Sequence, residues 1–437
     1  MLSFGTDGVR GRALTELTTS YVASLGSAAG QVLGGGRWLI GRDTRESGSV
    51  LEAALVAGLQ AAGADPRSLG VVPTPALAHL SSVIGVPAAM ITASHNPFHD
   101  NGVKIFGPGG LKLDDATESS IERAMVVFDG AVESAVSPTG DVSLGTYADH
   151  IVGMFAHGAL AGLRVVLDCA NGAMSEVAPL VAARLGADVV VIHASPNGRN
   201  INAACGATDP SSLAAAVVGH GAALGLAFDG DGDRVIAVDE HGTIVDGDRL
   251  IALAALQLRD AGDLVDDTVV VTVMSNLGFH RAMAAAGIHV VSTAVGDRYV
   301  LEALDAGGWS IGGEQSGHII YRHLASTGDG LLAGMRLAQF VHDHDAPLSV
   351  LARDVMSSYP QVLVNVRVAE RHPNVADELA AEIAAAEEQL GGEGRILLRP
   401  SGTEPLVRVM VEAATGDDAR RIADELAAVV QARFGGD

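Results

Sequence analysis

The chain of 437 residues exceeds the size at which one hydrophobic core usually stops growing, so several domains are expected. Its 52 acidic side chains against 28 basic ones give a formal net charge of -24, which opposes broad contact with a nucleic-acid backbone. With only two cysteines and no apolar run of the roughly 18 residues that span a membrane, the sequence predicts a cytoplasmic protein without a membrane partner.

The first part of the chain alternates between two kinds of apolar pattern. Residues 16–33 and 48–62 carry apolar side chains at helical spacing, whereas residues 38–41, 70–72 and 88–91 form short apolar runs typical of buried strands. This alternation predicts a mostly parallel sheet covered by helices. In such a sheet, ligands gather at the loops beyond the C-terminal ends of the strands.

A stretch rich in small and turn-forming residues, 129–148, predicts the first domain boundary. The second and third units are again expected to be α/β, and the last segment is expected to be an α+β domain. The expected domains are 1–145, 146–241, 242–355 and 356–437. The later strands are expected at 164–167, 223–228, 235–238, 268–273, 309–311, 362–368, 395–398 and 406–412, with helices at 375–390 and 417–434.

Four polar segments stand in apolar surroundings, and the first reads TASHNP at residues 92–97, directly after the predicted strand 88–91. Ser94 on such a loop can carry a phosphoryl group if a base removes its proton and a cation neutralises the developing charge. His95 beside it is a further candidate catalytic residue. A Ser/Asn turn that caps the next element explains the same letters.

The second segment, DGDGDR at residues 229–234, lies between two predicted strands. Asp229, Asp231 and Asp233 alternate in a glycine-rich turn, and their oxygens suit a hard cation such as Mg²⁺. A calcium loop of the EF-hand type is excluded because Arg234 stands where that loop needs glycine, and because strands flank the turn. An acidic surface hairpin remains the alternative.

The third segment, GGEQSGH at residues 312–318, follows the predicted strand 309–311. Glu314 and Ser316 can hydrogen-bond sugar hydroxyls, and His318 can exchange a proton near neutral pH. A buried structural histidine or a simple glycine turn would explain the segment equally well.

The fourth segment, RPSGTEP at residues 399–405, is followed by Arg408. Arginine side chains, hydroxyls and the free N–H groups of a Ser-Gly-Thr turn form a candidate phosphate cradle. The alternative is an ordinary proline-bounded β-turn. The candidate ligands here are Arg399, Ser401, Gly402, Thr403 and Arg408.

Together the four segments supply a nucleophile, a cation site, sugar ligands and a phosphate anchor, which is the combination that phosphoryl transfer requires. In this order, and over essentially the full chain, they resemble the α-D-phosphohexomutase superfamily. Within it the chain is most similar to the bacterial phosphoglucosamine mutases. That similarity rests on FGTDGVRG at 4–11, TVMSNLG at 272–278, VGDRYV at 295–300 and GGEQSGH at 312–318.

The resemblance implies a four-domain fold with the active site in a central cleft, and an isomerase that is phosphorylated on Ser94 at rest. It implies one Mg²⁺ held by the Ser94 phosphate, Asp229, Asp231 and Asp233. Glucosamine 6-phosphate would become glucosamine 1-phosphate through glucosamine 1,6-bisphosphate, which also serves as an activator. The product would lead towards UDP-N-acetylglucosamine and cell-wall precursors.

The resemblance also implies roles for the remaining site residues. Glu314 and Ser316 would bind ring hydroxyls, and the fourth segment would hold the phosphate that is not reacting. Lys104 and His318 would move the hydroxyl proton on opposite sides of the transfer. Arg10 and Arg234 would stabilise phosphoryl charge. The implied partner is a small amino sugar phosphate, and a homodimer is left open.

Three other functions are weighed against this one. A phosphomannomutase or phosphoglucomutase of the same superfamily would share the mechanism and differ in how the 2-position of the sugar is read. A sugar phosphate sensor without catalysis would keep the cradle and lose the chemistry. A serine hydrolase using Ser94 is disfavoured because no Gly-x-Ser-x-Gly elbow surrounds it.

Overall fold

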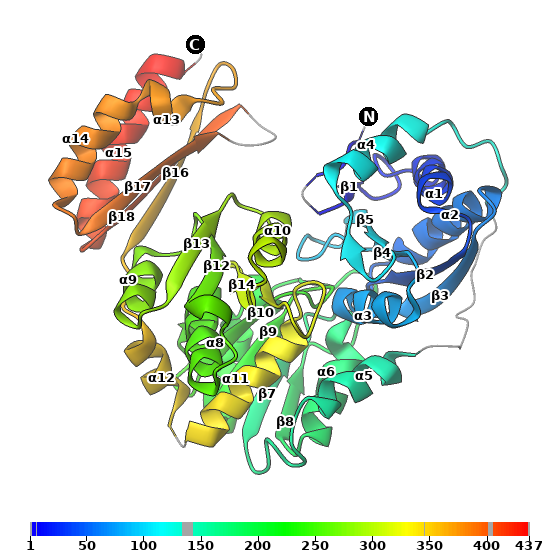
Figure 1. Ribbon diagram of the computed structural model, residues 1–437, viewed down its shortest axis with the longest axis horizontal. Coiled ribbons are helices and arrows are strands. Elements are labelled where there is room, and N and C mark those ends of the chain that lie inside the picture. Colours follow the sequence, from blue (N-terminus) through cyan, green and yellow to red (C-terminus); the bar gives the residue numbers. More distant parts are fainter. Residues whose placement is uncertain (1, 6, 133–142, 345, 401–404, 436–437) are drawn as a thin grey trace. The chain divides into compact units, whose positions relative to one another are not determined.

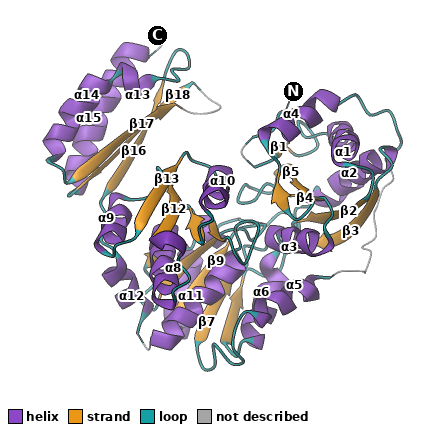
Figure 2. Ribbon diagram, viewed as in Figure 1, coloured by secondary structure: helices purple, strands orange, loops and turns teal. Residues whose placement is uncertain are grey.

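The computed structural model describes residues 2–5, 7–132, 143–344, 346–400 and 405–435. Backbone contacts divide the chain into two compact units. The first unit comprises Met1–Met274 and Gly287–Val355, and the second comprises Ser275–Ala286 and Met356–Asp437. Figures 1 and 2 show three α/β sheets in the first unit and a smaller sheet in the second.

The first sheet has the strand order β1-β5-β4-β2-β3, with β6 paired to β5. Strands β2, β3 and β4 are parallel, as the alternating pattern predicts, whereas β5 and its neighbours β1 and β6 extend the sheet in antiparallel fashion. The elements are β1 (Val9–Arg12), α1 (Thr19–Leu33), β2 (Arg37–Arg42), α2 (Gly48–Ala61), β3 (Asp65–Val71), α3 (Thr74–Ile84), β4 (Ala88–Ile91), β5 (Asp100–Gly107), β6 (Leu111–Lys112) and α4 (Asp115–Ala124).

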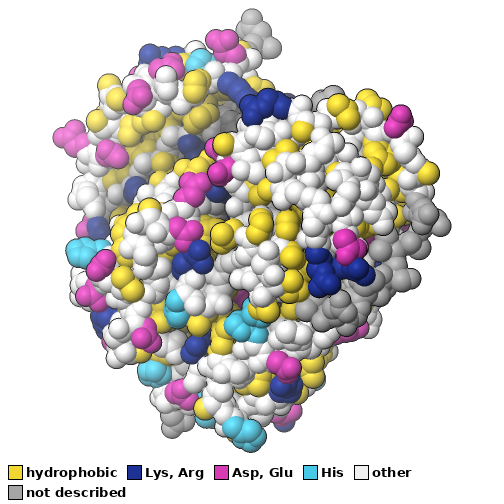
Figure 3. Space-filling model, turned by 45° about the vertical axis from the view of Figure 1, so that its right-hand side comes forward, with side chains coloured by type: hydrophobic (Ala, Val, Ile, Leu, Met, Phe, Trp, Pro, Cys, Tyr) yellow, Lys and Arg dark blue, Asp and Glu magenta, His cyan; other side chains and the backbone are white. Residues whose placement is uncertain are grey.

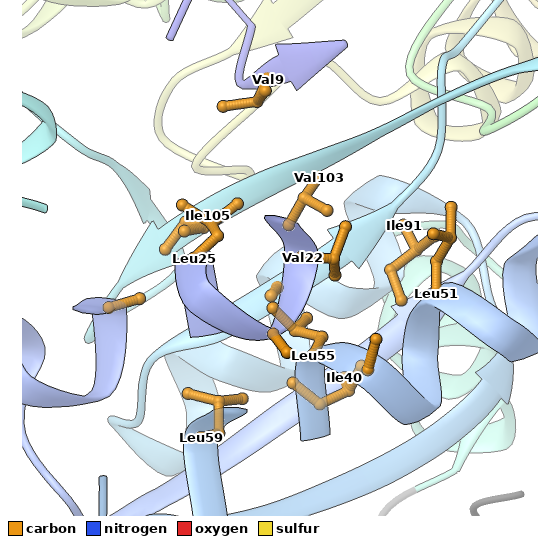
Figure 4. Packing of buried hydrophobic residues seen from close by; sticks show 14 of the residues in the cluster. Val9, Val22, Leu25, Ile40, Leu51, Leu55, Leu59, Ile91, Val103 and Ile105 are labelled. Atoms are coloured by element: carbon orange, nitrogen blue, oxygen red, sulfur yellow. The ribbon is translucent and has the colours of Figure 1, made fainter. Parts of the chain in front are cut away.

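The start of α1 differs from the predicted residue 16. Leu17 is bridged to Ala13, and the side chain of Thr18 accepts a hydrogen bond from the N–H of Tyr21, so the helix begins at residue 19. Helices α1 and α2 lie side by side against the sheet (Figure 1). Figure 4 shows the resulting core, in which buried aliphatic side chains of both helices meet those of β2, β4 and β5.

The second sheet has the order β11-β10-β9-β7-β8, with β7, β8 and β9 parallel and β10 antiparallel to β9. The β9–β10 hairpin therefore carries the DGDGDR turn, and Gly232 adopts a φ of +75° there. The elements are α5 (Leu144–Gly153), β7 (Arg164–Asp168), α6 (Met174–Arg184), β8 (Asp188–Ile192), η1 (Gly206–Thr208), α7 (Ser211–His220), β9 (Leu224–Phe228), β10 (Val235–Asp239) and β11 (Ile244–Val245).

The third sheet has the order β13-β12-β14-β15, of which β15 alone is antiparallel to its neighbour. The strand predicted at 309–311 begins only at Ile311, because Gly308 caps α10 in the left-handed region and the N–H of Trp309 is bonded to Leu304. The elements are α8 (Gly247–Ala261), η2 (Val265–Asp267), β12 (Thr268–Thr272), β13 (His289–Thr293), α10 (Asp297–Gly307), β14 (Ile311–Gly313), β15 (Ile319–Tyr321), α11 (Gly330–His344) and α12 (Leu348–Val355).

The second unit contains an antiparallel sheet of order β16-β18-β17, with α14 and α15 along one face (Figure 1). The helix predicted at 375–390 is two helices, because buried Leu379 has φ -113° and ψ 19° and interrupts helical geometry. The elements are α9 (Leu277–Ala285), β16 (Gln361–Arg367), α13 (Val375–Glu378), α14 (Ala380–Leu390), β17 (Gly394–Pro400), β18 (Leu406–Ala413) and α15 (Gly416–Phe434).

Two further features bear on possible partners. None of the helices in the described ranges combines the length and the apolar character that crossing a bilayer requires. On the face shown in Figure 3, acidic and basic side chains are interspersed with hydrophobic ones.

Candidate active site

Ser94 lies in the loop that follows β4, and its hydroxyl is held against an aspartate from the second sheet. Its Oγ donates a hydrogen bond to Oδ2 of Asp229 at 2.6 Å, and the residue is only 1% exposed. The backbone of Ser94 has a φ of +51°, a left-handed conformation that is uncommon for serine and often found at functional sites. The structure therefore brings the predicted residues Ser94 and Asp229 into direct contact.

A buried arginine holds the serine loop in this conformation. The guanidinium of Arg45 donates to the main-chain oxygens of Ser94 at 2.9 Å and of Asn96 at 2.8 Å, and it also donates to those of Pro97 and Asp100. Its charge is balanced by Asp43 at 2.9 Å. The planar, five-donor guanidinium is suited to organising several carbonyls at once.

Asp43 connects this arginine to the loop by a second route. Its Oδ2 accepts a hydrogen bond from the hydroxyl of Thr92 at 2.6 Å, and that hydroxyl accepts one from the N–H of Ser94 at 2.9 Å. The side-chain amide of Asn202 adds further support by donating to the main-chain oxygen of Ser94 at 2.9 Å. The loop is thus fixed from three sides.

Asp229, Asp231 and Asp233 converge as the alternating pattern predicts. One oxygen of each lies within 4.8 Å of the others, and all three side chains are buried. The Oδ1 atoms of Asp231 and Asp233 have no hydrogen-bond partner among the described residues. Buried carboxylate oxygens without partners are costly, and an all-oxygen cluster suits a hard cation. The residues present therefore fit Mg²⁺.

Lys104 on β5 neutralises part of this negative charge. Its ammonium lies 2.9 Å from an oxygen of each of Asp7, Asp231 and Asp233. Burial acts to lower the pKa of Lys104, but Asp231, Asp233 and Asp7 outweigh it and raise the pKa well above the ordinary value. Lys104 is consequently a fixed cation in this structure. Thr74 donates to Asp231 at 2.6 Å from another direction.

The carboxylates of the cluster differ in proton affinity. Burial, followed by Asp233 and Asp231, raises the pKa of Asp229 well above its usual range. Burial also acts to raise the pKa of Asp233, but Lys104 and then His318 outweigh it, so this pKa falls well below the usual value. Three buried carboxylates with one ammonium between them leave excess negative charge, which a divalent cation would balance.

Two histidines border the cluster. Nδ1 of His95 lies 3.3 Å from Oγ of Ser94, and burial, with help from Arg234 and Arg10, lowers the pKa of His95 to about 4. His95 is therefore neutral near pH 7 and can accept a proton.

His318 is buried, and its Nδ1 and Nε2 lie 3.6 Å and 3.5 Å from oxygens of Asp233 and Asp297. Burial acts to lower the pKa of His318, but these two carboxylates outweigh it and raise the pKa. Nε2 also accepts a hydrogen bond from the N–H of Gly328 at 3.2 Å. His318 is thus placed to carry a proton beside the aspartate cluster.

The other predicted residues of the first unit lie around the same cluster. Arg10 pairs with Asp7 at 2.6 Å, and Arg234 directs its main-chain N–H to Asp229 at 3.2 Å. Nε of Arg234 is buried without a hydrogen-bond partner among the described residues. Such a donor is available to an anionic ligand.

The two predicted sugar ligands lie in the turn between β14 and β15. Ser316 is exposed, and its hydroxyl donates to Oε2 of Glu314 at 3.3 Å. Oε1 of Glu314 accepts a hydrogen bond from the N–H of Gly296 at 3.2 Å. The carboxylate is therefore positioned from both sides, and the exposed hydroxyl can contact a ligand.

The predicted phosphate cradle lies in the second unit. Arg399 on β17 and Arg408 on β18 stand opposite each other in the antiparallel register. Burial and then the charge of Arg408 lower the pKa of Arg399, and Nε of Arg408 is buried without a partner among the described residues. Two facing cations of this kind suit an anion. Ser401, Gly402 and Thr403 lie outside the described residues.

Comparison with known proteins adds an independent observation. Four family models of phosphoglucomutase/phosphomannomutase match the chain: domain I at residues 1–127, domain II at 145–242, domain III at 246–359 and the C-terminal domain at 363–429. A phosphoglucosamine mutase of Frankia casuarinae is 53% identical over 446 residues, covering 98% of both chains. The chain belongs to the phosphoglucosamine mutase family. It is therefore an isomerase of the phosphomutase class.

Solved structures agree on the fold of this phosphoglucosamine mutase family member. A phosphoglucomutase/phosphomannomutase family protein from Burkholderia thailandensis superposes with a TM-score of 0.81 at 24% identity, covering 98% of this chain and 97% of that one. N-acetylphosphoglucosamine mutase of Aspergillus fumigatus, solved with GlcNAc-6P and magnesium, gives 0.70 at 19% identity, covering 98% and 95%. The predicted fold class and family are both confirmed.

Several residues that contact Ser94 or the charged groups around it are not identified by the sequence patterns. Asp7 lies within the FGTDGVRG segment and contacts Lys104, while Asp43 and Arg45 come directly after β2. A polar cluster at the end of a parallel strand is the same signal that identified Ser94. It could have identified Arg45. Asn202 follows no strand directly, and only the structure brings it to Ser94.

Proposed function

We propose that this chain interconverts glucosamine 6-phosphate and glucosamine 1-phosphate, with Ser94 carrying the phosphoryl group between turnovers. The observation that carries the proposal is the buried contact of 2.6 Å between Ser94 Oγ and Asp229 in a three-aspartate cluster. Membership of the phosphoglucosamine mutase family supports the choice of an amino sugar phosphate. The product would feed the synthesis of UDP-N-acetylglucosamine, in the cytoplasm.

The metal of this proposal is Mg²⁺, held by Asp229, Asp231, Asp233 and an oxygen of the Ser94 phosphate. Its support is the oxygen-only ligand set with two unpartnered buried oxygens, and the magnesium named for the Aspergillus fumigatus relative. When bound, the cation neutralises charge on the transferring phosphoryl group.

The cationic side chains around Ser94 then stabilise the equatorial oxygens during transfer. Lys104 is proposed as a fixed ammonium at this task because its surrounding carboxylates hold its proton. Arg234 and Arg10 contribute guanidinium donors, and the unpartnered Nε of Arg234 supports its part.

Proton movement is assigned to the two histidines. In the first half-reaction, the sugar hydroxyl attacks phosphorus and gives its proton to a base, the bond from phosphorus to Ser94 Oγ breaks, and the released Oγ takes up one proton. His95, 3.3 Å from Ser94 Oγ and neutral, can exchange the proton of the serine hydroxyl. His318, whose Nδ1 lies 3.6 Å from Asp233, is proposed to accept the proton of the sugar hydroxyl in its neutral form.

The sugar is proposed to be held at two ends. Glu314 and Ser316 bind ring hydroxyls, and Arg399 and Arg408 bind the phosphate that does not react, together with Ser401, Gly402 and Thr403. Glucosamine 1,6-bisphosphate forms when Ser94 gives up its phosphoryl group. After the sugar turns end for end, its 6-phosphate regenerates phosphoserine. A hexose bisphosphate consequently also activates enzyme that has lost its phosphate.

Intact-mass measurement and a mutase assay test this proposal on the same protein. The active chain carries about 80 additional daltons, and Ser94→Ala loses both that mass and the mutase activity while it still binds glucosamine 6-phosphate. Ser119→Ala, which changes an exposed serine in α4, serves as the matched control and keeps both. Activity that survives in Ser94→Ala would overturn the mechanism. Sugar binding without turnover in the unmodified chain would instead favour a sensor.

Substrate choice needs its own comparison, because phosphomannomutases and phosphoglucomutases share the fold. We expect kcat/KM for glucosamine 6-phosphate to exceed that for glucose 6-phosphate and mannose 6-phosphate. Equal or higher values for either of the latter would assign the chain to that activity.

A further inference from the structure

A second cluster of ligand-type side chains lies in the second α/β sheet, apart from the three aspartates. Asp168 ends β7, His193 follows β8, and Cys205 precedes η1. One ligand atom of each lies within 4.8 Å of the others. Because β7 and β8 are parallel neighbours, their C-terminal ends bring the first two side chains together. No role in phosphoryl transfer has been given to any of the three.

The carboxylate of Asp168 is fully buried and lacks a strong cationic partner. It accepts hydrogen bonds from the N–H groups of Ala170 and Gly206 at 2.9 Å each. Of the described residues, only His193 lies within ion-pair distance, with Nδ1 at 3.1 Å. Buried carboxylates are normally paired with a cation or bound to a metal.

The contact between Asp168 and His193 is short but is not a hydrogen bond. Nδ1 of His193 is buried and has no hydrogen-bond partner among the described residues, although the Asp168 oxygen is 3.1 Å away. A nitrogen and a carboxylate oxygen at this separation without a hydrogen bond can both bind one cation. The side chain of His193 is 30% exposed, which gives the pair a route to solvent.

Cys205 completes the set with a soft ligand. Its thiol is free and fully buried, and burial followed by the charge of Asp168 raises its pKa to about 12. A metal can displace the thiol proton, since thiolate is the ligand form. The side-chain amide of Asn171 donates to Sγ at 3.9 Å. Hydrogen bonds of this kind orient the ligands of metal sites.

We propose that Asp168, His193 and Cys205 form a second metal site, which takes Zn²⁺ or another thiophilic divalent transition metal. Sulfur, imidazole nitrogen and one carboxylate suit such ions, whereas Mg²⁺ prefers oxygen alone. Three protein ligands leave a fourth position that water can fill. The site is thus chemically distinct from the three-aspartate cluster.

The site is connected to the serine loop through a short segment. Asn202, three residues before Cys205, donates to the main-chain oxygens of Ser94 at 2.9 Å and Asn96 at 3.1 Å. Metal bound at Cys205 restrains the segment that carries this amide. Occupancy of the site therefore supports the loop on which the nucleophile stands.

Cobalt spectroscopy on the full chain tests the site. The protein is stripped of metals, supplied with excess Mg²⁺ to fill the oxygen cluster, and titrated with Co²⁺. A near-ultraviolet thiolate-to-cobalt charge-transfer band is expected to saturate at one equivalent and to disappear on addition of Zn²⁺. Ligation by oxygen alone gives no such band, so absence of the band at saturating Co²⁺ overturns the proposal.

Variants identify the ligands. Cys205→Ser is expected to lose the band, and Cys169→Ser, which alters the adjacent buried thiol outside the cluster, is expected to keep it. His193→Asn tolerates the left-handed φ of +48° and is expected to weaken Co²⁺ binding at least about tenfold. A band that persists in Cys205→Ser, or unchanged affinity in His193→Asn, refutes the assignment even if another variant fails to fold.

Discussion

The guanidinium of Arg45 donates a hydrogen bond to the main-chain oxygen of Ser94 at 2.9 Å, although 49 residues separate them in the chain. Arg45 is 2% exposed and its remaining donors are directed to other carbonyls of the same loop and to Asp43. This buried side chain thus contributes more hydrogen bonds to the main chain of the serine loop than Thr92 or Asn202 does. This makes Arg45 a positioning residue for the proposed nucleophile.

Arg45→Lys is expected to lower kcat by about 100-fold with little change in KM, because an ammonium cannot bind the same carbonyls in one plane and the nucleophile shifts. Steady-state mutase kinetics measure this, and circular dichroism checks that the fold persists. Arg67→Lys is the control, since the Arg67 side chain is partly exposed and its ion-pair partner among the described residues is Asp65. A kcat within twofold of that of the unmodified enzyme would show that the serine loop keeps its conformation without Arg45.

Gly230→Ala tests the close approach of the metal turn to the serine loop. A Cβ at this position would lie 2.6 Å from the main-chain oxygen of Ser94 and 2.8 Å from Nδ2 of Asn202. Overpacking of this kind destabilises by about 1–3 kcal/mol, and it displaces the nucleophile. Chemical denaturation and the mutase assay are the measurements. Gly219→Ala in α7 meets nothing within 4 Å and is expected to leave both unchanged or to add stability.

Asp231→Asn is expected to weaken Mg²⁺ activation at least about tenfold, because a carbonyl oxygen replaces a charged ligand. Activity of the chelator-treated enzyme is measured as Mg²⁺ is added back. The control is Asp188→Asn, an exposed aspartate whose ion-pair partner is Arg164. Equal Mg²⁺ dependence in Asp231→Asn and the unmodified chain would remove Asp231 from the metal site.

Arg408→Gln should raise KM for glucosamine 6-phosphate by about 10- to 100-fold, since one charged hydrogen-bonding partner of the distal phosphate is lost. The free energy of unfolding should remain unchanged or increase, because the variant removes the positive charge that faces Arg399. Arg420→Gln, which changes an exposed arginine of α15, provides the comparison. If KM is unaffected, the distal phosphate is bound elsewhere.

Asp329 gives a prediction for pH and stability. Its two oxygens accept hydrogen bonds from the hydroxyl of Tyr147 at 2.8 Å, beside a cavity of about 240 Å³. Burial raises the pKa of Asp329 from 3.8 to about 6. The folded state therefore binds this proton more tightly than the unfolded state, and Asp329 makes unfolding harder as pH falls from about 6 towards 4.

The measurement is the free energy of unfolding of the unmodified chain and of Asp329→Asn at pH 7 and at pH 4. The unmodified chain should gain about 2 kcal/mol relative to the variant over this range, because the pKa differs by about two units and the unfolded carboxyl is still partly ionised at pH 4. A constant difference between the two proteins would mean that Asp329 has an ordinary pKa.

Much of the site could be predicted, because its polar residues directly follow short apolar runs that are recognisable as strands. Ser94 follows a run of four apolar residues, and the three aspartates lie in the turn of a hairpin whose strands are fully buried. These patterns are local in the sequence. They therefore identify the chemistry without a structure.

The remainder depends on contacts between distant segments. Lys104 lies on β5, which carries polar residues at its start and joins the sheet in antiparallel fashion. The βαβ pattern therefore does not predict this strand or the position of its lysine. Arg45 and Asn202 donate hydrogen bonds to main-chain oxygens of the serine loop. Every residue has a main-chain oxygen, so the sequence does not show which of them these side chains contact. The division of the predicted helix 375–390 likewise follows from the burial of Leu379.

The placement of the lysines has a practical consequence. Lys104 and Lys112 are the only lysines in the sequence, and their side chains are 4% and 12% exposed, each engaged by carboxylates. Amine-reactive dyes, biotin esters and lysine cross-linkers therefore find almost no accessible lysine on this chain. Immobilisation or labelling for single-molecule work has to rely on an introduced surface cysteine, because both natural thiols are buried as well.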